Sequence, residues 1–244
     1  MNVHKGFVFF LTLLLVFAGL PARAAVLVRV GINASYAPFE SVDDSGRLSG
    51  FDIDLVNAWA RAEGVTVKFV NLPWPNLLAS LESGRVDMIV SAVAVTPERQ
   101  RRFDFSVPYY FEPQVLLVPT AAQHDDPREL ASIGALAGSS AIDWLARLGV
   151  RPAALQRYDG VPPMLADLRS GAIDGVFGDL HALRRAVATD ASLRVISKPQ
   201  YGRDAYAFVV KKGNRVMLDR ANAGLRMLRQ SGGIDRLLHA YPGL

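Results

Sequence analysis

Arg99 is a side chain able to clamp a carboxylate. Its planar guanidinium can donate two parallel hydrogen bonds to such a group, which a point charge such as lysine cannot do. The residue follows Thr96 and Pro97, which are typical of an N-cap and the first position of a helix. A second interpretation stays open, because Arg101 and Arg102 follow closely and all three could be charges on a solvated helix face.

Asp179 is the second candidate for a polar contact with a small molecule. It follows a short apolar run, 175–177, and precedes a segment with helical spacing, 180–187. The carboxyl ends of strands are where α/β sheets place their ligands. An aspartate in this position also commonly caps the next helix, and the two roles are compatible.

The elements expected to position these residues alternate along the chain, which favours an α/β fold with largely parallel sheets. Short apolar runs predict strands at 26–32, 65–70, 88–93, 115–118, 175–177 and 206–210. Helical periodicity or capping signals predict helices at 51–62, 77–81, from 97 onward, 139–148, 161–168, 179–187, 216–229 and 234–240.

The first 24 residues have the pattern of a cleavable signal peptide. Lys5 provides a positive start, 7–20 is an apolar run, and Ala22-Arg23-Ala24 is an A-x-A cleavage site. A membrane-spanning helix needs roughly 20 apolar residues, so an uncleaved anchor is the less favoured alternative. We expect export to the periplasm, with residues 1–24 removed.

Composition excludes several other classes. The formal net charge is only +4, and the charges are interspersed without the basic block that would bind nucleic acid. Cysteine is absent, so we expect neither disulfides nor a lipid anchor on a cysteine after the signal peptide.

Five short motifs occur in one order within about eighty residues. They are Tyr36-Ala37-Pro38-Phe39-Glu40, Gly50-Phe51-Asp52-Ile53-Asp54-Leu55, Trp74-Pro75, Gly84-Arg85-Val86-Asp87 and Thr96-Pro97-Glu98-Arg99. Together they resemble the first lobe of family 3 solute-binding proteins, the extracytoplasmic receptors of polar amino-acid ABC importers. The resemblance implies capture of an amino acid by hinge closure and its delivery to a membrane ABC permease, with no cofactor.

The resemblance also implies the type II periplasmic binding protein fold. Two lobes, each a mixed but mainly parallel sheet flanked by helices, would be joined by a two-segment hinge. Lobe 1 would comprise 25–108 and 208–244, lobe 2 would comprise 114–202, and the hinge segments would be 109–113 and 203–207. We expect a monomer.

The family's ligand contacts can be transferred position by position. Arg99 matches the carboxylate clamp, Ser139 and Ser140 match a segment that meets the same carboxylate from lobe 2, and Asp179 matches the acceptor of the α-ammonium group. The predicted ligand-binding residues are Arg99, Asp179, Trp74, Tyr36, Asn33, Ser91, Ala92, Ala94, Ser139 and Ser140.

Three of these positions bear on the ligand's identity. Tyr36 and Trp74 correspond to a pair of aromatic residues that often sandwich the ligand side chain, although Trp74 could instead be a core residue. Asn33 stands where relatives that prefer charged or strongly polar side chains can carry aspartate. We therefore expect an uncharged or aromatic amino acid.

Ala94 departs from the family pattern, which usually has a hydroxyl-bearing residue at this position. Its backbone N–H can still donate a hydrogen bond, but one side-chain bond to the carboxylate is missing. A hydrogen bond to a charged group contributes about 1.5–3 kcal/mol, so the substitution should weaken carboxylate binding without abolishing it.

Two other functions share this fold. Trp74-Pro75-Asn76-Leu77 and Glu98-Arg99-Gln100-Arg101 also resemble cyclohexadienyl dehydratases, which need a general acid near the leaving hydroxyl. Their glutamate corresponds here to Ala182, so no catalytic residue is predicted, although Glu40 or His181 could substitute. A ligand-sensing subunit of a signalling system is the third reading. The histidines lie at no metal-ligand spacing, and no metal site is expected.

Overall fold

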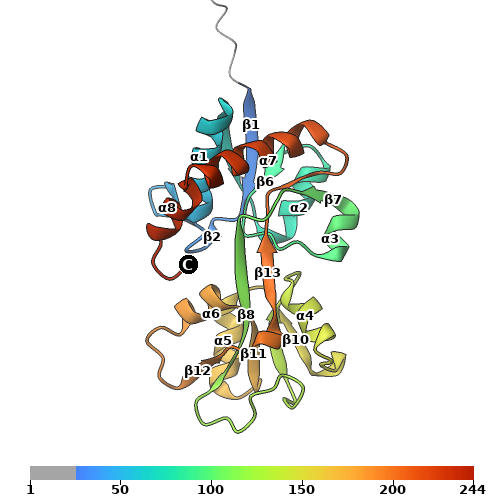
Figure 1. The fold of residues 1–244 in the computed structure, drawn as a ribbon. Coiled ribbons are helices and arrows are strands. Elements are labelled where there is room, and N and C mark those ends of the chain that lie inside the picture. The colour runs from blue at the N-terminus through green and yellow to red at the C-terminus, as the bar shows by residue number, and fades with distance from the viewer. Residues whose placement is uncertain (1–25) are drawn as a thin grey trace, which may run out of the picture.

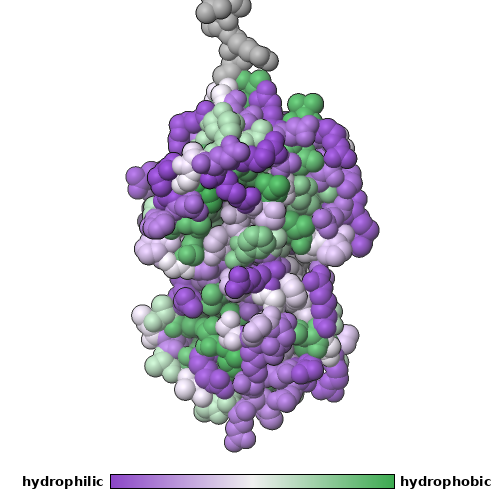
Figure 2. Space-filling model, viewed as in Figure 1, coloured by the Kyte–Doolittle hydropathy of each residue, from purple (hydrophilic) through white to green (hydrophobic). Residues whose placement is uncertain are grey.

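The computed structural model describes residues 26–244, so the predicted signal peptide lies outside the described residues. The described chain folds into two lobes, each around its own sheet, and β8 and β13 run side by side between them (Figure 1). Polar residues cover most of the face shown in Figure 2, which narrows between the lobes. Within residues 26–244, no helix is long and apolar enough to cross a membrane.

Lobe 1 is organised by a five-stranded mixed sheet in the order β5-β1-β6-β14-β7. Strand β14 is antiparallel to both of its neighbours, and the other four strands share one direction. The strands are β1 (Leu27–Ile32), β5 (Thr66–Asn71), β6 (Met88–Ile89), β7 (Phe103–Phe105) and β14 (Val209–Lys211). A small antiparallel sheet of β2 (Ser35–Tyr36), β3 (Glu40–Val42) and β4 (Leu48–Ser49) precedes the first helix.

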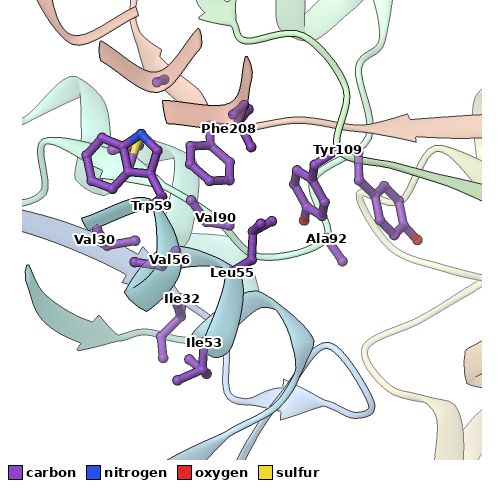
Figure 3. Packing of buried hydrophobic residues seen from close by; sticks show 14 of the residues in the cluster. Val30, Ile32, Ile53, Leu55, Val56, Trp59, Val90, Ala92, Tyr109 and Phe208 are labelled. Atoms are coloured by element: carbon purple, nitrogen blue, oxygen red, sulfur yellow. The ribbon is translucent and has the colours of Figure 1, made fainter. Parts of the chain in front are cut away.

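The helices of lobe 1 are α1 (Phe51–Glu63), α2 (Trp74–Glu82), α3 (Pro97–Arg102), α7 (Arg215–Gln230) and α8 (Gly233–His239). Helices α1, α7 and α8 contact one another over one buried cluster, while the apolar residues of α2 join a second cluster that includes residues from β6 and β14. The side chain of Trp59 is fully buried, and its ring lies edge-on to Phe208 at 6.0 Å (Figure 3). Gly224 allows α7 to pack closely against Trp59, since a Cβ added to this glycine would lie 2.3 Å from the indole.

Lobe 2 contains a second mixed sheet in the order β10-β9-β11-β8-β12. Its strands are β8 (Tyr110–Pro119), β9 (Ile133–Leu136), β10 (Leu155–Tyr158), β11 (Gly175–Asp179) and β12 (Leu193–Ile196). Its helices are α4 (Ala141–Arg147), α5 (Val161–Ser170) and α6 (Leu180–Ala186), with short 3-10 turns η1 (Pro152–Ala154) and η2 (Pro199–Tyr201). Two buried clusters, one containing residues of α4 and the other residues of α5, form the core of this lobe.

Two strands connect the lobes. The first half of β8 pairs antiparallel with β13 (Arg203–Tyr206), from Tyr110 opposite Tyr206 to Pro113 opposite Arg203. The second half of β8 continues into the lobe 2 sheet. These paired residues fall within the two segments predicted as a hinge, and their hinge role stays a prediction.

Three elements differ from the sequence-based expectation in ways that matter for the cleft. The strand predicted at 88–93 ends at Ile89, because Ala92 adopts a left-handed backbone with φ of 46° and turns the chain. Helix α2 begins at Trp74 rather than at 77, with Pro75 in its first turn. The strand predicted at 206–210 is two strands, since the chain passes from the lobe connection into lobe 1 between β13 and β14.

Candidate functional site

A cavity of about 340 Å³ lies between the two lobes. All ten residues predicted to bind a ligand line it, from both lobes. The residues from lobe 1 come from the chain after β1, including β2, from the start of α2, from the loop after β6 and from α3. In lobe 2, Ser139 and Ser140 follow β9, and Asp179 is the last residue of β11. Folding thus gathers at one place side chains that are up to about 145 positions apart in sequence, a separation that only tertiary structure can close.

Arg99 is held in the wall of this cavity by the lobe 1 chain and reaches across to lobe 2. The Thr96 hydroxyl accepts a hydrogen bond from the Arg99 backbone N–H at 3.2 Å, which confirms the predicted N-cap. The guanidinium donates to the carbonyl of Ala94 at 2.8 Å and to that of Gly138 at 2.9 Å. Only 9% of Arg99 is exposed, so it is not a charge on a solvated helix face.

Burial of Arg99 lowers the pKa of its guanidinium, and the surrounding carboxylates of Asp204, Asp143 and Asp179 oppose that effect. The group donates two bonds to protein carbonyls and carries five N–H donors in all. The remaining donors are suited to a carboxylate brought into the cavity, where desolvation strengthens such a pair.

Trp74 forms the neighbouring part of the lobe 1 wall. The Arg99 guanidinium lies 5.4 Å from the centre of its ring, which is a cation–π distance. The indole is half-buried and lines the cavity rather than filling the core. Across the cleft, an added Cβ on Gly138 would lie 3.5 Å from its ring nitrogen, so the two lobes are already close here.

Asp179 does not use its side chain as a helix cap. It occupies the N-cap position of α6, but the carboxylate makes no capping bond. Instead it accepts hydrogen bonds from the hydroxyls of Tyr36 and Tyr206, the latter at 2.8 Å, and from the amide of Gln114. Because Tyr36 belongs to lobe 1, this carboxylate joins both lobes at the cavity wall.

Ser139 and Ser140 form the start of α4 on the lobe 2 side. The Ser139 hydroxyl donates to the carbonyl of Leu136 at 2.8 Å, and the Ser140 hydroxyl donates to Asp204 rather than capping the helix. Asp204 also accepts from the Trp144 indole at 2.8 Å and from Gln114 at 3.1 Å. The α4 start is therefore fixed to the strand β13 that connects the lobes.

The amide of Gln114 links the two lobe 2 carboxylates. Its Nε2 donates to both Asp179 and Asp204, and its Oε1 is buried without a partner among the described residues. Burial raises the pKa of Asp204, whereas bonds from Ser140 and Trp144 and the charge of Arg99 lower it.

Asn33, Ser91 and Glu40 form a connected polar row on the lobe 1 side. The Asn33 backbone N–H donates to the Ser91 hydroxyl at 3.0 Å, and that hydroxyl donates to Glu40 Oε1 at 2.6 Å. The Asn33 side chain donates to the Leu72 carbonyl at 2.9 Å and accepts from Ser35 at 2.6 Å. Both the donor and the acceptor of the Asn33 side chain are thus hydrogen-bonded to residues of lobe 1.

Ala92 and Ala94 bring backbone rather than side-chain groups to the cavity. The Ala92 N–H donates to Asp52 Oδ2 at 2.7 Å, which holds the left-handed turn in place. Ala94 supplies the carbonyl that positions Arg99 and is 3% exposed. No hydroxyl is present at this position, as the sequence already indicated.

Sequence reasoning missed part of the site. Glu40 and Asp159 are not among the predicted ligand-binding residues and Tyr206 falls in a predicted hinge segment, yet all three line the cavity. Gln114 and Asp204 were not singled out either. A usable signal was present, because Glu112 and Gln114 are polar residues inside the apolar strand β8, and both are almost fully buried.

His181, expected near the cleft, lies outside the cavity lining. Its Nδ1 is 2.6 Å from Glu112, its Nε2 contacts the Gly243 carbonyl, and its ring packs on Phe39 and Tyr110. Burial raises the pKa of Glu112, and the bonds from His181 lower it. Ala182 borders an extension of the cavity beside Asp179 and carries no proton to transfer. Among residues 26–244, no cluster of three or more His, Asp or Glu side chains could hold a metal ion.

Comparison with known proteins places this geometry among amino-acid receptors. The family model described as "Bacterial extracellular solute-binding proteins, family 3" matches residues 28–243. A probable histidine-binding protein of Neisseria gonorrhoeae is 30% identical over 226 residues, covering 90% of this chain and 84% of that protein. ABC transporter arginine-binding protein 1 of Escherichia coli (strain K12) is 28% identical, covering 88% of this chain and 90% of that protein.

A solved structure connects the fold to an enzyme as well. An ancestral amino-acid-binding protein, described as a precursor of cyclohexadienyl dehydratase, superposes with a TM-score of 0.75 at 27% identity, covering 88% of this chain and 94% of that one. Its match supports the expected two-lobed α/β architecture.

Proposed function

This chain belongs to family 3 of the bacterial extracellular solute-binding proteins, and from that premise we propose that it captures an amino acid between its two lobes in the periplasm. The captured ligand would be delivered to a membrane ABC permease by a monomeric receptor. The observation that carries the proposal is the cavity with Arg99 on one side and Asp179 on the other. A zwitterion needs donors for its carboxylate and an anion for its ammonium group, and these two residues supply them.

The proposed mechanism is closure around the ligand. Arg99 and Trp74 would receive the ligand in lobe 1, and Ser139, Ser140 and Asp179 would complete its contacts from lobe 2. A ligand shifts a conformational equilibrium only through its different affinity for the two states, so contacts from both lobes are required. The existing bonds from Arg99 to Gly138 and from Tyr36 to Asp179 support this, since they already join the lobes at the cavity.

For the side chain of the ligand, we propose a nitrogen-bearing group such as that of arginine or histidine. The relatives named for histidine and arginine do not support the expected restriction to uncharged or aromatic amino acids. That expectation relied on Asn33 being neutral. The cavity has further acidic groups near Asn33, namely Glu40 in its lining and Asp52 behind it.

We propose a binding function rather than catalysis. A dehydratase would need a general acid beside Asp179, and Ala182 stands there. Glu40 lines the cavity and could take over such a role, so the experiment below also includes prephenate and arogenate.

The test is thermal unfolding of protein that has been unfolded and refolded to strip bound ligand, against a panel of amino acids. A ligand at 1,000 times its dissociation constant adds about 4 kcal/mol of stability, which for a chain of this size is roughly 8–16 °C in midpoint. We expect such a shift with one or a few amino acids and no turnover. No shift with any amino acid would contradict the proposal, and consumption of prephenate or arogenate would replace it with the enzyme.

A further inference from the structure

Two carboxyl groups are buried together beneath the lobe 1 side of the cavity. Glu40 lies at the start of β3 with 1% exposure and lines the cavity, and Asp52 lies in the first turn of α1 with no exposure. They are called the Glu40–Asp52 pair below. Both count among the acidic groups near Asn33, but neither has so far been assigned a contact with the ligand.

Among the described residues, one oxygen of each carboxyl group accepts hydrogen bonds and the other accepts none. Glu40 Oε1 accepts from Ser91, and Asp52 Oδ2 accepts from the Ala92 N–H and from the Tyr109 hydroxyl at 2.9 Å. Glu40 Oε2 and Asp52 Oδ1 are buried and find no donor among the described residues. Two adjacent buried carboxylates repel each other, and a single shared proton removes the repulsion while giving both leftover oxygens a partner.

The proton belongs on Glu40. Asp52 has two protein donors and sits at the positive end of the 13-residue helix α1, which favours its anion, whereas Glu40 has one donor. Burial raises the pKa of Glu40 well above its usual range, and the charge of Asp52 raises that pKa further, while the Ser91 bond lowers it. Burial raises the pKa of Asp52 to about 6, against the lowering effect of its hydrogen bonds.

Among the residues that the structure describes, no Lys, Arg or His side chain makes a hydrogen bond or ion pair with either carboxyl group. Tyr109, before β8, faces both carboxyls, and burial raises the pKa of its phenol well above its usual value. The Tyr241 hydroxyl, after α8, donates to Asp54 in the same first turn of α1 at 2.6 Å. A positive charge arriving from the cavity would therefore be the first to meet Glu40.

We propose that Glu40 recognises the cationic end of the ligand's side chain and releases its proton to solvent when that side chain binds. The step moves one proton from Glu40 Oε2 to the buffer, and the new carboxylate pairs with the ligand cation. A neutral side chain leaves the proton in place. This inference deepens the proposed function and rests on it, because it needs an amino acid bound at Arg99.

The test compares L-arginine with L-citrulline, its neutral isostere, by titration calorimetry at pH 7 in two buffers of different ionisation enthalpy. The slope of the observed heat against buffer enthalpy counts the protons released. We expect close to one proton for arginine and none for citrulline. Arginine binding without proton release would overturn the proposal, as would binding of citrulline and other neutral amino acids without any binding of arginine.

Glu40→Gln is the matched variant, because it keeps the shape of the side chain and the bond from Ser91. We expect it to lose proton release and at least tenfold of the preference for arginine over citrulline, while citrulline affinity shows that the variant is folded. An unchanged preference would also overturn the proposal. Failure of the proposed function itself is distinguishable, since the wild-type protein would then bind neither ligand and no other amino acid.

Discussion

The cavity is bordered by two sets of buried or half-buried carboxyl groups that differ in how many donors reach them. One set, the Asp179–Asp204 cluster, receives hydrogen bonds from side chains of both lobes and of the strands between them. The donors are Tyr36, Tyr206, Gln114, Ser140 and Trp144. Within residues 26–244, the Glu40–Asp52 pair receives bonds only from Ser91, Ala92 and Tyr109 and retains two oxygens without donors.

The difference shows how one cavity can hold carboxyl groups with two roles. Hydrogen bonds from donors favour the charged form of a carboxylate. Burial raises the pKa of Asp204, and the bonds from Ser140 and Trp144 lower it against that effect. The positive charge of Arg99, from the opposite wall of the cavity, also lowers the pKa of Asp204. A buried carboxyl pair with few donors lowers the free-energy cost of its burial by keeping a proton. The first set suits a permanent ammonium group, and the second suits a charge that is present in some ligands only.

The largest effect is expected from Arg99→Ala, which removes the cation that faces the Asp179–Asp204 cluster. Two hydrogen bonds to a charged group, at about 1.5–3 kcal/mol each, would be lost, so affinity should fall by at least about 100-fold. Calorimetric titration measures it. Arg101→Ala is the control, since Arg101 is on the same helix and exposed. Unchanged affinity in Arg99→Ala would remove Arg99 from the mechanism.

Asp179→Asn should come next, because it neutralises the acceptor of the ammonium group. Losing one partner of a desolvated charge pair costs about 2 kcal/mol or more, which is roughly 30-fold in affinity. The analogue of the ligand without its amino group should bind the variant and the wild type equally. Asp125→Asn, on a carboxylate that is 53% exposed, is the control. A similar loss for both ligands would mean that Asp179 shapes the site without meeting the ammonium group.

Gln114→Leu breaks the link inside the Asp179–Asp204 cluster. It withdraws one donor from each carboxylate, and we expect about tenfold weaker binding and about 1–3 kcal/mol lower free energy of unfolding. Part of the stability loss is offset, since the buried Oε1 without a partner also disappears. Chemical denaturation and titration measure the two effects. If the exposed control Gln156→Leu changes both quantities equally, the link has no special role.

The smallest effect is a pH dependence that belongs to the Glu40–Asp52 pair. A carboxyl whose pKa is raised on folding stabilises the protein at low pH, and that stability is lost as pH rises through the folded pKa. For Asp52 this window lies between its ordinary value of 3.8 and about 6, and for Glu40 it begins at 4.5 and extends upward. The slope is at most about 1.4 kcal/mol per pH unit for each proton.

Glu40→Gln should flatten this decline, and denaturation midpoints between pH 5 and 8 measure it. Glu82→Gln, on a carboxylate that is 44% exposed, should leave the decline as it is in the wild type. An unchanged decline in Glu40→Gln would mean that the pair holds no proton.

The sequence predicted the residues of the cavity better than the interactions among them. Motif order located Trp74 and Arg99, each in the first turn of a helix with local start signals, and position-by-position resemblance located Asp179. The signals for Gln114 and Asp204 are not local. Gln114 lies 65 positions from its partner Asp179, and Asp204 lies 64 positions from its partner Ser140. These residues come together only because β8 and β13 pair where the chain passes between the lobes.

The same limit applies to the Glu40–Asp52 pair. Each residue belongs to one of the five ordered motifs, and the sequence indicates for Glu40 only the possibility of a substitute general acid. Nothing in the spacing showed that the two carboxyls face each other and that Glu40 reaches the cavity. That follows from the turn at Ala92, whose left-handed backbone no periodicity predicts.

The most direct test of the account is the structure of the protein with its amino acid bound. We predict that the ligand lies in the cavity between the lobes, with a carboxylate oxygen about 2.7–3.2 Å from the guanidinium nitrogens of Arg99 and the ammonium nitrogen at a similar distance from Asp179. A ligand seated elsewhere, or seated in the cavity with its carboxylate away from Arg99, would contradict it.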